Sequence, residues 1–266
     1  MDFIQLLFYS SSIATLIFAI ILATQKQLIP MFRFSRKQYL YSAMLALLNP
    51  FGYYLVLLKA YSILPAQLAQ PLNYTWPIML VILSAIILKQ KLTIKSLSAI
   101  IVSFLGVFLI SSRGELLNYH FTEPLGVLLA TGSSIIWASF WIFNVKDTRN
   151  EIAKLFWNFV FGTLYILITL LLFSKFTIQH HYGIYAVAYI GFFEMGITFI
   201  FWLRAMQFTS SNDKISNLVF LSPFMALVFI HFILGEQIVY TTVLGLVFII
   251  LGIVIQQYKR RVESRT

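Results

Sequence analysis

The sequence predicts an all-α polytopic membrane protein, built as an inverted repeat of transmembrane helices. Three observations lead to this fold class. The chain of 266 residues is 60% hydrophobic and only 11% charged, whereas about 25% of the residues in soluble domains are charged. Its mean hydropathy is +0.86, with apolar runs along the whole length. Residues 72–109 also match residues 218–255, at an offset of 146 positions.

The apolar runs are long enough to cross a bilayer. A transmembrane helix needs about 20 predominantly apolar residues. Nine segments meet this requirement, and most are joined by short polar or charged connections, which makes consecutive helices antiparallel neighbours. The expected transmembrane helices are residues 2–22, 37–59, 66–88, 94–112, 124–144, 153–174, 182–206, 213–234 and 239–258.

Lysine and arginine residues are distributed very unevenly between the two ends of these helices. Sixteen fall on one side of the predicted bundle and three on the other. Because cytoplasmic loops are enriched in these residues, we expect the rich side, which includes the C-terminus, to be cytoplasmic. The net charge of +10 then reflects orientation in a bacterial inner (plasma) membrane rather than a nucleic-acid partner.

The internal repeat aligns residues that have positional roles in helices. Pro77 falls on Pro223 and Gly106 falls on Gly252; proline removes a backbone donor, and glycine permits close packing. With nine crossings, the corresponding helices run in opposite directions. This inverted arrangement recurs in secondary transporters, whose substrate sites lie near the membrane midplane between the halves.

The repeat also divides the chain into two halves of unequal helix number. The second half has five expected helices and the first has four, because a counterpart of 124–144 is missing before Met1. The chain is therefore expected to be truncated at its start or a natural nine-helix variant. The expected parts are a first half (1–112), a linker (113–123), a second half (124–258) and a basic cytoplasmic tail (259–266).

The first candidate binding residues lie around Pro77. Asn73, Trp76 and Pro77 have the spacing i, i+3, i+4 and would share one face of a continuous helix. A proline inside a membrane helix is tolerated where protein or a cavity satisfies the freed backbone group. We interpret Asn73 and Trp76 as cavity-lining residues. The alternative is a tryptophan at the membrane interface, with Asn73 capping the helix.

Other candidates lie in the second half of the chain. Glu194 is the one acidic residue deep within an expected span, where a charge costs about 3 kcal/mol or more. It could carry protons or bind substrate, or be a protonated glutamate with a structural role; its counterpart in the repeat is Asn49. Trp137 begins a stripe with Trp141 and Asn144, which indicates either a cavity wall or an interfacial belt.

These motifs resemble the drug/metabolite transporter superfamily, EamA type. The resemblance rests on LNYTWPIML (72–80), LVFLSPFMA (218–226) and GEQ (235–237), and it implies ten helices in two inverted five-helix repeats. N-Y-x-W-P (73–77) and SSIIWASFWIFN (133–144) resemble the aromatic amino-acid exporter branch. The chain departs from the family at KQK (89–91), where Gly-Glu is usual, and in lacking the family's first helix.

The sequence therefore predicts a secondary transporter that exports small metabolites such as amino acids by alternating access. Its partners would be a small solute, the bilayer and, as a candidate coupling ion, the proton. No cofactor, metal site or enzymatic activity is expected, since there is no cysteine and no catalytic motif. The alternative is a truncated or non-transporting membrane protein. Expected substrate-binding residues are Asn49, Tyr53, Asn73, Trp76, Trp137, Glu194, Thr198, Trp202 and Ser222, with Pro77 and Pro223 as helix kinks.

Overall fold

The chain forms an all-α polytopic membrane protein. A computed structural model describes residues 1–87, 93–111, 123–176, 181–202 and 222–258, and every regular element in these ranges is helical. Six of the nine expected spans are long and apolar enough to cross a membrane. These six are Phe3–Thr24, Arg36–Ile63, Ala66–Ile87, Pro124–Asn144, Glu151–Phe173 and Gly183–Trp202. The other three expected spans correspond, within the described residues, to shorter apolar helices. Part of the expected span 213–234 lies outside these residues.

The helices fall into two compact units, and each unit combines segments from both halves of the sequence. Unit 1 contains Met1–Leu55 and Phe143–Asn212. Unit 2 contains Val56–Ile142 and Asp213–Thr266. The predicted halves, separated by the linker 113–123, describe the sequence repeat and are a different division of the chain from these two units. That division stays a prediction.

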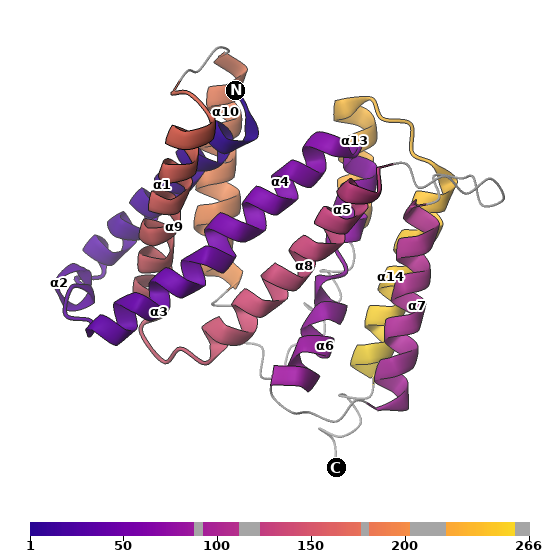
Figure 1. Cartoon of the computed structure of the whole chain (residues 1–266), viewed down its shortest axis with the longest axis horizontal. Coiled ribbons are helices and arrows are strands. Elements are labelled where there is room, and N and C mark those ends of the chain that lie inside the picture. Colours follow the sequence, from indigo (N-terminus) through magenta and orange to yellow (C-terminus); the bar gives the residue numbers. More distant parts are fainter. Residues whose placement is uncertain (88–92, 112–122, 177–180, 203–221, 259–266) are drawn as a thin grey trace. The chain divides into compact units, whose positions relative to one another are not determined.

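Unit 1 is built around an antiparallel pair of helices, α1 and α9 (Figure 1). Phe18 stacks edge-on against Phe159, and one turn away the Thr15 and Thr163 hydroxyls are 3.3 Å apart. The π-helix η1 packs on α9, and the π-helix η2 packs on α1. The elements are α1 (Phe3–Thr24), α2 (Leu28–Met31), α3 (Arg36–Ala46), η1 (Leu47–Gly52), α9 (Glu151–Phe173), α10 (His181–Tyr189) and η2 (Ile190–Ile197).

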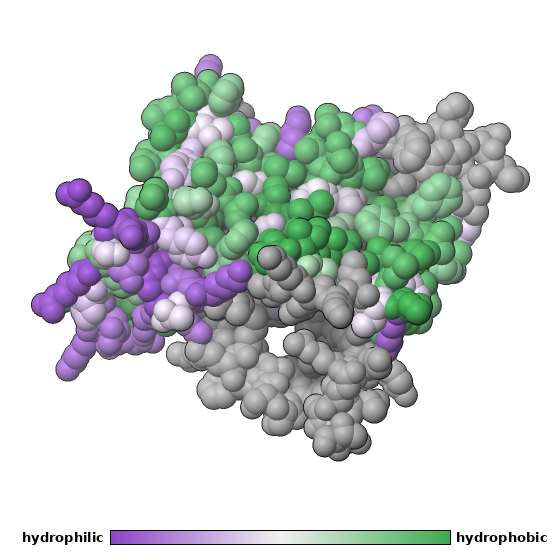
Figure 2. All heavy atoms as spheres, turned by 60° about the horizontal axis from the view of Figure 1, so that its bottom comes forward, coloured by the Kyte–Doolittle hydropathy of each residue, from purple (hydrophilic) through white to green (hydrophobic). Residues whose placement is uncertain are grey.

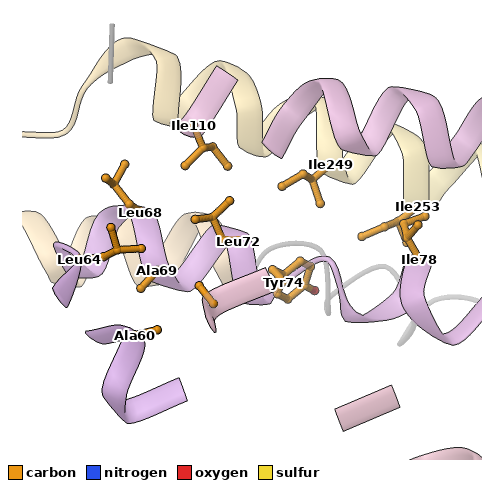
Figure 3. Packing of buried hydrophobic residues seen from close by; sticks show 11 residues of the cluster. Ala60, Leu64, Leu68, Ala69, Leu72, Tyr74, Ile78, Ile110, Ile249 and Ile253 are labelled. Carbon is orange, nitrogen blue, oxygen red and sulfur yellow. The ribbon is translucent and has the colours of Figure 1, made fainter. Parts of the chain in front are cut away.

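Unit 2 is built around a second antiparallel pair, α7 and α14, which lie side by side in Figure 1. Leucine, isoleucine and alanine side chains from α5, α6, α7 and α14 form its core, including Leu72, Ile78, Ile110 and Ile249 (Figure 3). The elements are α5 (Ala66–Asn73), α6 (Trp76–Ile87), α7 (Ile94–Ser111), α13 (Ser222–Leu234) and α14 (Tyr240–Tyr258). The helices α4 (Tyr53–Ile63) and α8 (Pro124–Val145) contribute residues to both units.

Contacts in unit 2 follow the internal repeat. The Ser103 hydroxyl donates to the carbonyl oxygen of Ile249 at 3.3 Å, and these two residues are 146 positions apart. On either side, Gly106 meets Gly245, and Gly252 meets Ala99. At the offset of 146, the repeat partner of Gly106 is Gly252 and the repeat partner of Gly245 is Ala99. Exchanging repeat partners therefore converts the first contact into the second. The two helices are therefore related by a local twofold axis perpendicular to their length, as an inverted repeat requires.

Unit 1 contains the same kind of relation. Gly162 packs on Pro50, and Gly196 packs on Ile17. The repeat partner of Gly162 is Ile17, at an offset of 145 residues, and the repeat partner of Pro50 is Gly196, at an offset of 146. Exchanging repeat partners therefore converts one contact into the other. An added Cβ at Gly162 would lie 2.5 Å from the Pro50 ring, and one at Gly196 would lie 2.9 Å from the Ile17 side chain. Neither position accepts a larger side chain without displacement.

Two of the expected continuous helices are interrupted. The span expected at 37–59 bends at Asn49, whose backbone is extended (φ −153°, ψ 127°), and its helical structure continues to Ile63. The span expected at 66–88 ends one helix at Asn73 and starts another at Trp76. Pro77 is thus the second residue of α6, where a missing N–H breaks no helical hydrogen bond. The expectation that Asn73, Trp76 and Pro77 share one face of a continuous helix was wrong.

Candidate functional site

In unit 1, two departures from regular α-helix lie at corresponding positions of the repeat: a kink at Asn49 within η1, and the π-helical segment η2. η1 carries Asn49, and η2 carries Glu194, which is 145 positions later. π-Helical turns are rare and occur frequently at functional sites. The predicted pairing of Asn49 with Glu194 therefore coincides with a shared departure from regular α-helix, and this departure distinguishes these two residues from the other candidates.

Asn49 is one of three completely buried polar residues in α3, η1 and α9. The side chains of Asn49, Ser42 and Asn158 are each completely buried. Neither amide atom of Asn49 or Asn158, nor the hydroxyl of Ser42, has a hydrogen-bond partner among the described residues. Leaving such a group unpaired costs about 1–3 kcal/mol. Buried polar atoms without a partner lower stability and call for an explanation, so these three residues are candidates for a functional role.

The position of Asn158 follows from helix register. The Arg149 guanidinium donates to the carbonyl oxygen of Gln38, and Gly162 touches Pro50, so α3–η1 and α9 run parallel. Asn158 lies one turn before Gly162 and therefore faces the same neighbour, at the level of the residues just before Pro50. The sequence analysis did not single out Asn158. Its burial depends on α9 facing η1, which the apolar pattern of α9 does not reveal.

Glu194 is held by a tyrosine. Its side chain is exposed, and its carboxylate accepts a hydrogen bond from the hydroxyl of buried Tyr54. Thr198, one turn further along the helix, is exposed as well. The site residue predicted from the sequence was the neighbouring Tyr53. It is also buried, and its ring centroid lies 4.9 Å from that of Tyr54. Successive residues of a helix are rotated by about 100°, so the kink at Asn49, a few residues before Tyr53, affects which tyrosine faces Glu194.

In unit 2, the interruption between α5 and α6 is tied to α8. The Ser133 hydroxyl donates to Asn73 Oδ1 at 2.9 Å, and the hydroxyls of Thr75 and Ser134 are 3.0 Å apart. Both serines are completely buried. The hydroxyls of α8 thus satisfy polar groups where the helix is broken, as a bilayer interior requires. Asn73 is a polar residue at a helix break, and it does not cap the start of a helix.

The aromatic candidates differ in exposure. Trp76 and Trp137 are partly buried, whereas Trp141 is almost completely buried, with its ring 5.5 Å from that of Trp137. Trp202 in unit 1 is partly buried as well, and Ser222 in unit 2 is exposed at the first described residue of α13. Of the nine predicted site residues, unit 1 contains Asn49, Tyr53, Glu194, Thr198 and Trp202, and unit 2 contains Asn73, Trp76, Trp137 and Ser222.

Pro223 is the second described residue of α13. The residues before Ser222, where the predicted kink at this proline would have to be judged, lie outside the described part of the chain.

The GEQ motif has a structural task in unit 2. Gly235 ends α13 with φ +70°, a backbone conformation that disfavours other residues. The Glu236 carboxylate accepts from the backbone N–H groups of Ala66 and Gln67, at 2.9 and 3.1 Å, at the start of α5. The Gln67 side chain in turn donates to the Gln237 carbonyl and accepts from the Val239 N–H. Gln67 therefore bridges the start of α5 and the segment after α13.

The connection between α8 and α9 is fixed by two basic residues. The Lys154 ammonium donates to the carbonyl oxygens of Asn144 and Asp147, at 3.0 and 2.9 Å. The Arg149 guanidinium pairs with the Asp147 carboxylate at 2.5 Å. Burial of Asp147 opposes its ionisation, but the hydrogen bonds and charge of Arg149 hold the pKa of the carboxyl below its usual value.

The helices and their internal symmetry define a class of protein, the polytopic membrane proteins with inverted repeats. A solved crystal structure that is 17% identical in sequence superposes with a TM-score of 0.68, over 99% of this chain and 90% of its own, and shows the same fold. The model of the EamA-like transporter family matches residues 1–112 and 124–256. The chain belongs to this family, within the drug/metabolite transporter superfamily.

Curated relatives carry names of the same kind. An uncharacterized transporter of Clostridium kluyveri is 29% identical over 178 residues, which cover 64% of this chain and 56% of the relative. The uncharacterized transporter YoaV of Bacillus subtilis is 23% identical over 216 residues, which cover 79% of this chain and 72% of the relative. YyaM of the same organism is 26% identical over 229 residues, which cover 82% and 73%. The chain is thus an integral membrane protein of a transporter family.

Proposed function

We propose that the protein is a secondary transporter that exports small metabolites by alternating access between its two inverted halves. The observation that carries this proposal is that Asn49 and Glu194, at corresponding repeat positions, both lie where a membrane helix departs from regular α-helix, at a kink and in a π-helical segment. Membership of a transporter family supports a transported solute. The nine predicted site residues are proposed to contribute to the solute path, each through the polar or aromatic group described above.

The substrates proposed are amino acids, with aromatic amino acids first. The support is the N-Y-x-W-P sequence at 73–77 and the partly buried indoles of Trp76 and Trp137. Indole rings stack on flat solutes and bind ammonium groups by cation–π interaction.

Glu194 is proposed to couple export to proton entry. A carboxylate within a membrane helix is costly and is a functional candidate by default, and the Glu194 carboxylate accepts a hydrogen bond from the Tyr54 hydroxyl. Release of the proton to one side and of the solute to the other would link the two fluxes. The membrane location proposed is the bacterial inner membrane, with the C-terminus in the cytoplasm.

The test is transport by the purified full chain in proteoliposomes. Counterflow of labelled phenylalanine, tryptophan, alanine and lysine would be measured with and without a pH gradient. We expect counterflow of the aromatic amino acids, stimulated severalfold by the gradient, and loss of the stimulation in Glu194→Gln. The matched control, Glu123→Gln, removes an exposed acidic group just before α8 and should behave as the parent protein.

Three outcomes would contradict parts of this proposal. Retention of the pH stimulation in Glu194→Gln would refute proton coupling through this residue. Counterflow of alanine or lysine without phenylalanine would refute the aromatic preference. Failure to transport any solute, by a protein that is folded and correctly inserted, would instead support the non-transporting alternative.

A further inference from the structure

A group of basic side chains in unit 1 has no hydrogen-bond or ion-pair partner in the described part of the chain. Lys26, Arg33, Arg36 and Lys37, which we call the basic surface, lie between the end of α1 and the first turn of α3, and all four are exposed. The sequence has no acidic residue between Asp2 and Glu115. Among the described residues, no hydrogen bond or ion pair involves the side chain of any of the four. Figure 2 shows hydrophilic residues gathered at the edge where α2 and the start of α3 lie in Figure 1.

Two of these charges are placed against the helix dipole. Arg36 and Lys37 occupy the first turn of α3, which contains no acidic residue. The N-terminus of a helix carries partial positive charge and favours anions, so cations in this turn are destabilising. Ser35 and Gln38 already form a capping box there, so the basic residues are not needed to satisfy backbone groups. A bound anion would turn this unfavourable arrangement into a favourable one.

Large apolar side chains accompany the charges. Ile29 and Phe32, between Lys26 and Arg33, are 71% and 61% exposed. An exposed patch that combines basic and large apolar groups fits the boundary of a bilayer, where apolar groups enter the acyl region and cations meet headgroups. A purely basic patch would not require these apolar neighbours.

The segment is held rigidly at this position. The Trp157 indole N–H donates to the carbonyl oxygen of Met31 at 3.0 Å. The rings of Phe32 and Tyr39 meet the same indole edge-on, with centroids 5.6 and 4.7 Å away. Tryptophan and tyrosine gather at membrane–water interfaces. This aromatic group therefore fixes the basic surface at the expected depth of lipid headgroups.

We propose that the basic surface is a binding site for anionic phospholipids of the adjacent leaflet. The phosphate of the headgroup would lie between the side chains of Arg33, Arg36 and Lys37, at the N-terminus of α3. The acyl chains would lie along the exposed side chains of Ile29 and Phe32. The inference needs no transport activity and is independent of the proposed function.

The test uses the full chain in a neutral detergent, titrated with phosphatidylglycerol or phosphatidylcholine, with bound lipid measured by native mass spectrometry. The variant is Lys26→Gln/Arg33→Gln/Arg36→Gln/Lys37→Gln. Each basic residue near an anionic surface contributes roughly fivefold in affinity. We expect the variant to lose at least tenfold in affinity for phosphatidylglycerol, with little change for phosphatidylcholine. The matched control, Lys259→Gln/Arg260→Gln/Arg261→Gln/Arg265→Gln, removes the same charge from the tail and should lose less than twofold.

A second measurement guards against a variant that merely folds poorly. Arg36→Gln/Lys37→Gln removes the two cations at the start of α3, so its melting temperature without lipid should rise, while the increase caused by phosphatidylglycerol should shrink. Poor folding would lower the melting temperature instead. Equal losses in the tail control, an unchanged affinity in the fourfold variant, or equal stabilisation by inorganic phosphate would each overturn the proposal.

Discussion

Glu236 is expected to be one of the residues on which the stability of unit 2 depends most. Its carboxylate accepts two backbone hydrogen bonds at the start of α5, a helix whose own N-terminal residue, Pro65, has no capping side chain. Hydrogen bonds to a charged group contribute about 1.5–3 kcal/mol each. The charge adds about 0.3–1 kcal/mol through the helix dipole. Since the two bonds share one carboxylate and are not additive, we expect Glu236→Ala to cost about 2–4 kcal/mol.

Glu236→Gln separates the contribution of charge from that of shape. The amide keeps one acceptor oxygen and the size of the side chain, so roughly half of the loss, about 1–2 kcal/mol, is expected. The matched control is Gln237→Ala, because the Gln237 side chain is exposed and only its backbone carbonyl takes part in the bridge. This variant should unfold as the parent protein does.

The assay is thermal unfolding of the purified chain in detergent, followed by circular dichroism. For a chain of this size, 1 kcal/mol corresponds to about 2–4 °C, so Glu236→Ala should lower the midpoint by roughly 5–15 °C and Glu236→Gln by about half as much. A midpoint for Glu236→Ala within about 1 °C of the parent value would refute the reasoning, because α5 would then start equally well without its acceptor.

Two further predictions concern packing and charge. Gly106→Ala places a Cβ 2.4 Å from the Gly245 carbonyl oxygen and should cost about 1–3 kcal/mol by overpacking; in thermal unfolding Gly132→Ala, which meets nothing within 4 Å, should be unchanged or slightly stabilised. The pKa of Asp147 is held below its usual value by Arg149, so its ionised form stabilises the fold above about pH 4, and this stability is lost as pH falls through the lowered pKa. Asp147→Asn should therefore lower the midpoint at pH 7 and flatten its decline between about pH 5 and pH 3; a variant with the parent pH profile would contradict this.

The fold class was predictable because it depends on the length and position of apolar runs, which can be read directly from the sequence. Apolar runs of transmembrane length set the expected positions of the helices, and the structure places α1, α8 and α9 within about two residues of them. The repeat was predictable from the match of 72–109 to 218–255, in which Pro77 falls on Pro223 and Gly106 falls on Gly252. Both glycines indeed lie in contacts between α7 and α14.

The helix interruptions were harder to predict. Pro77 was expected to kink a helix and is the second residue of α6, just after the interruption at Tyr74-Thr75, whereas Pro50 received no such role and follows the kink at Asn49. The local sequence does not distinguish these cases. Whether a proline interrupts a helix or begins one depends on whether neighbours such as Ser133, Ser134 and Thr75 can satisfy the backbone and side chains at a break.

The candidate site was predicted in part for a related reason. Asn49 and Glu194 were identified from their polarity within apolar spans, and the structure adds that Asn49 lies at a helix kink and Glu194 in a π-helical segment. Tyr54 and Asn158 were missed because the residues that face a neighbour depend on helix rotation. A single π-helical turn changes the rotation of every residue after it. A sequence pattern with a period of 3.6 residues assumes a regular α-helix and so does not predict this change.

The reciprocal glycine contacts between α7 and α14 also limit how unit 2 can move. Gly106 and Gly252 each press against backbone of the opposite helix, at two levels along the pair. If one helix slid past the other, the backbone at these glycines would clash with neighbouring side chains such as Ile110 and Ile249. The two helices are therefore expected to move as one rigid unit. Any displacement in a working cycle must then be taken up where main-chain hydrogen bonding is already interrupted. In unit 2, one such interruption among the described residues is Tyr74-Thr75, between α5 and α6. We therefore expect α7 and α14 to move together, with the bending at Tyr74-Thr75.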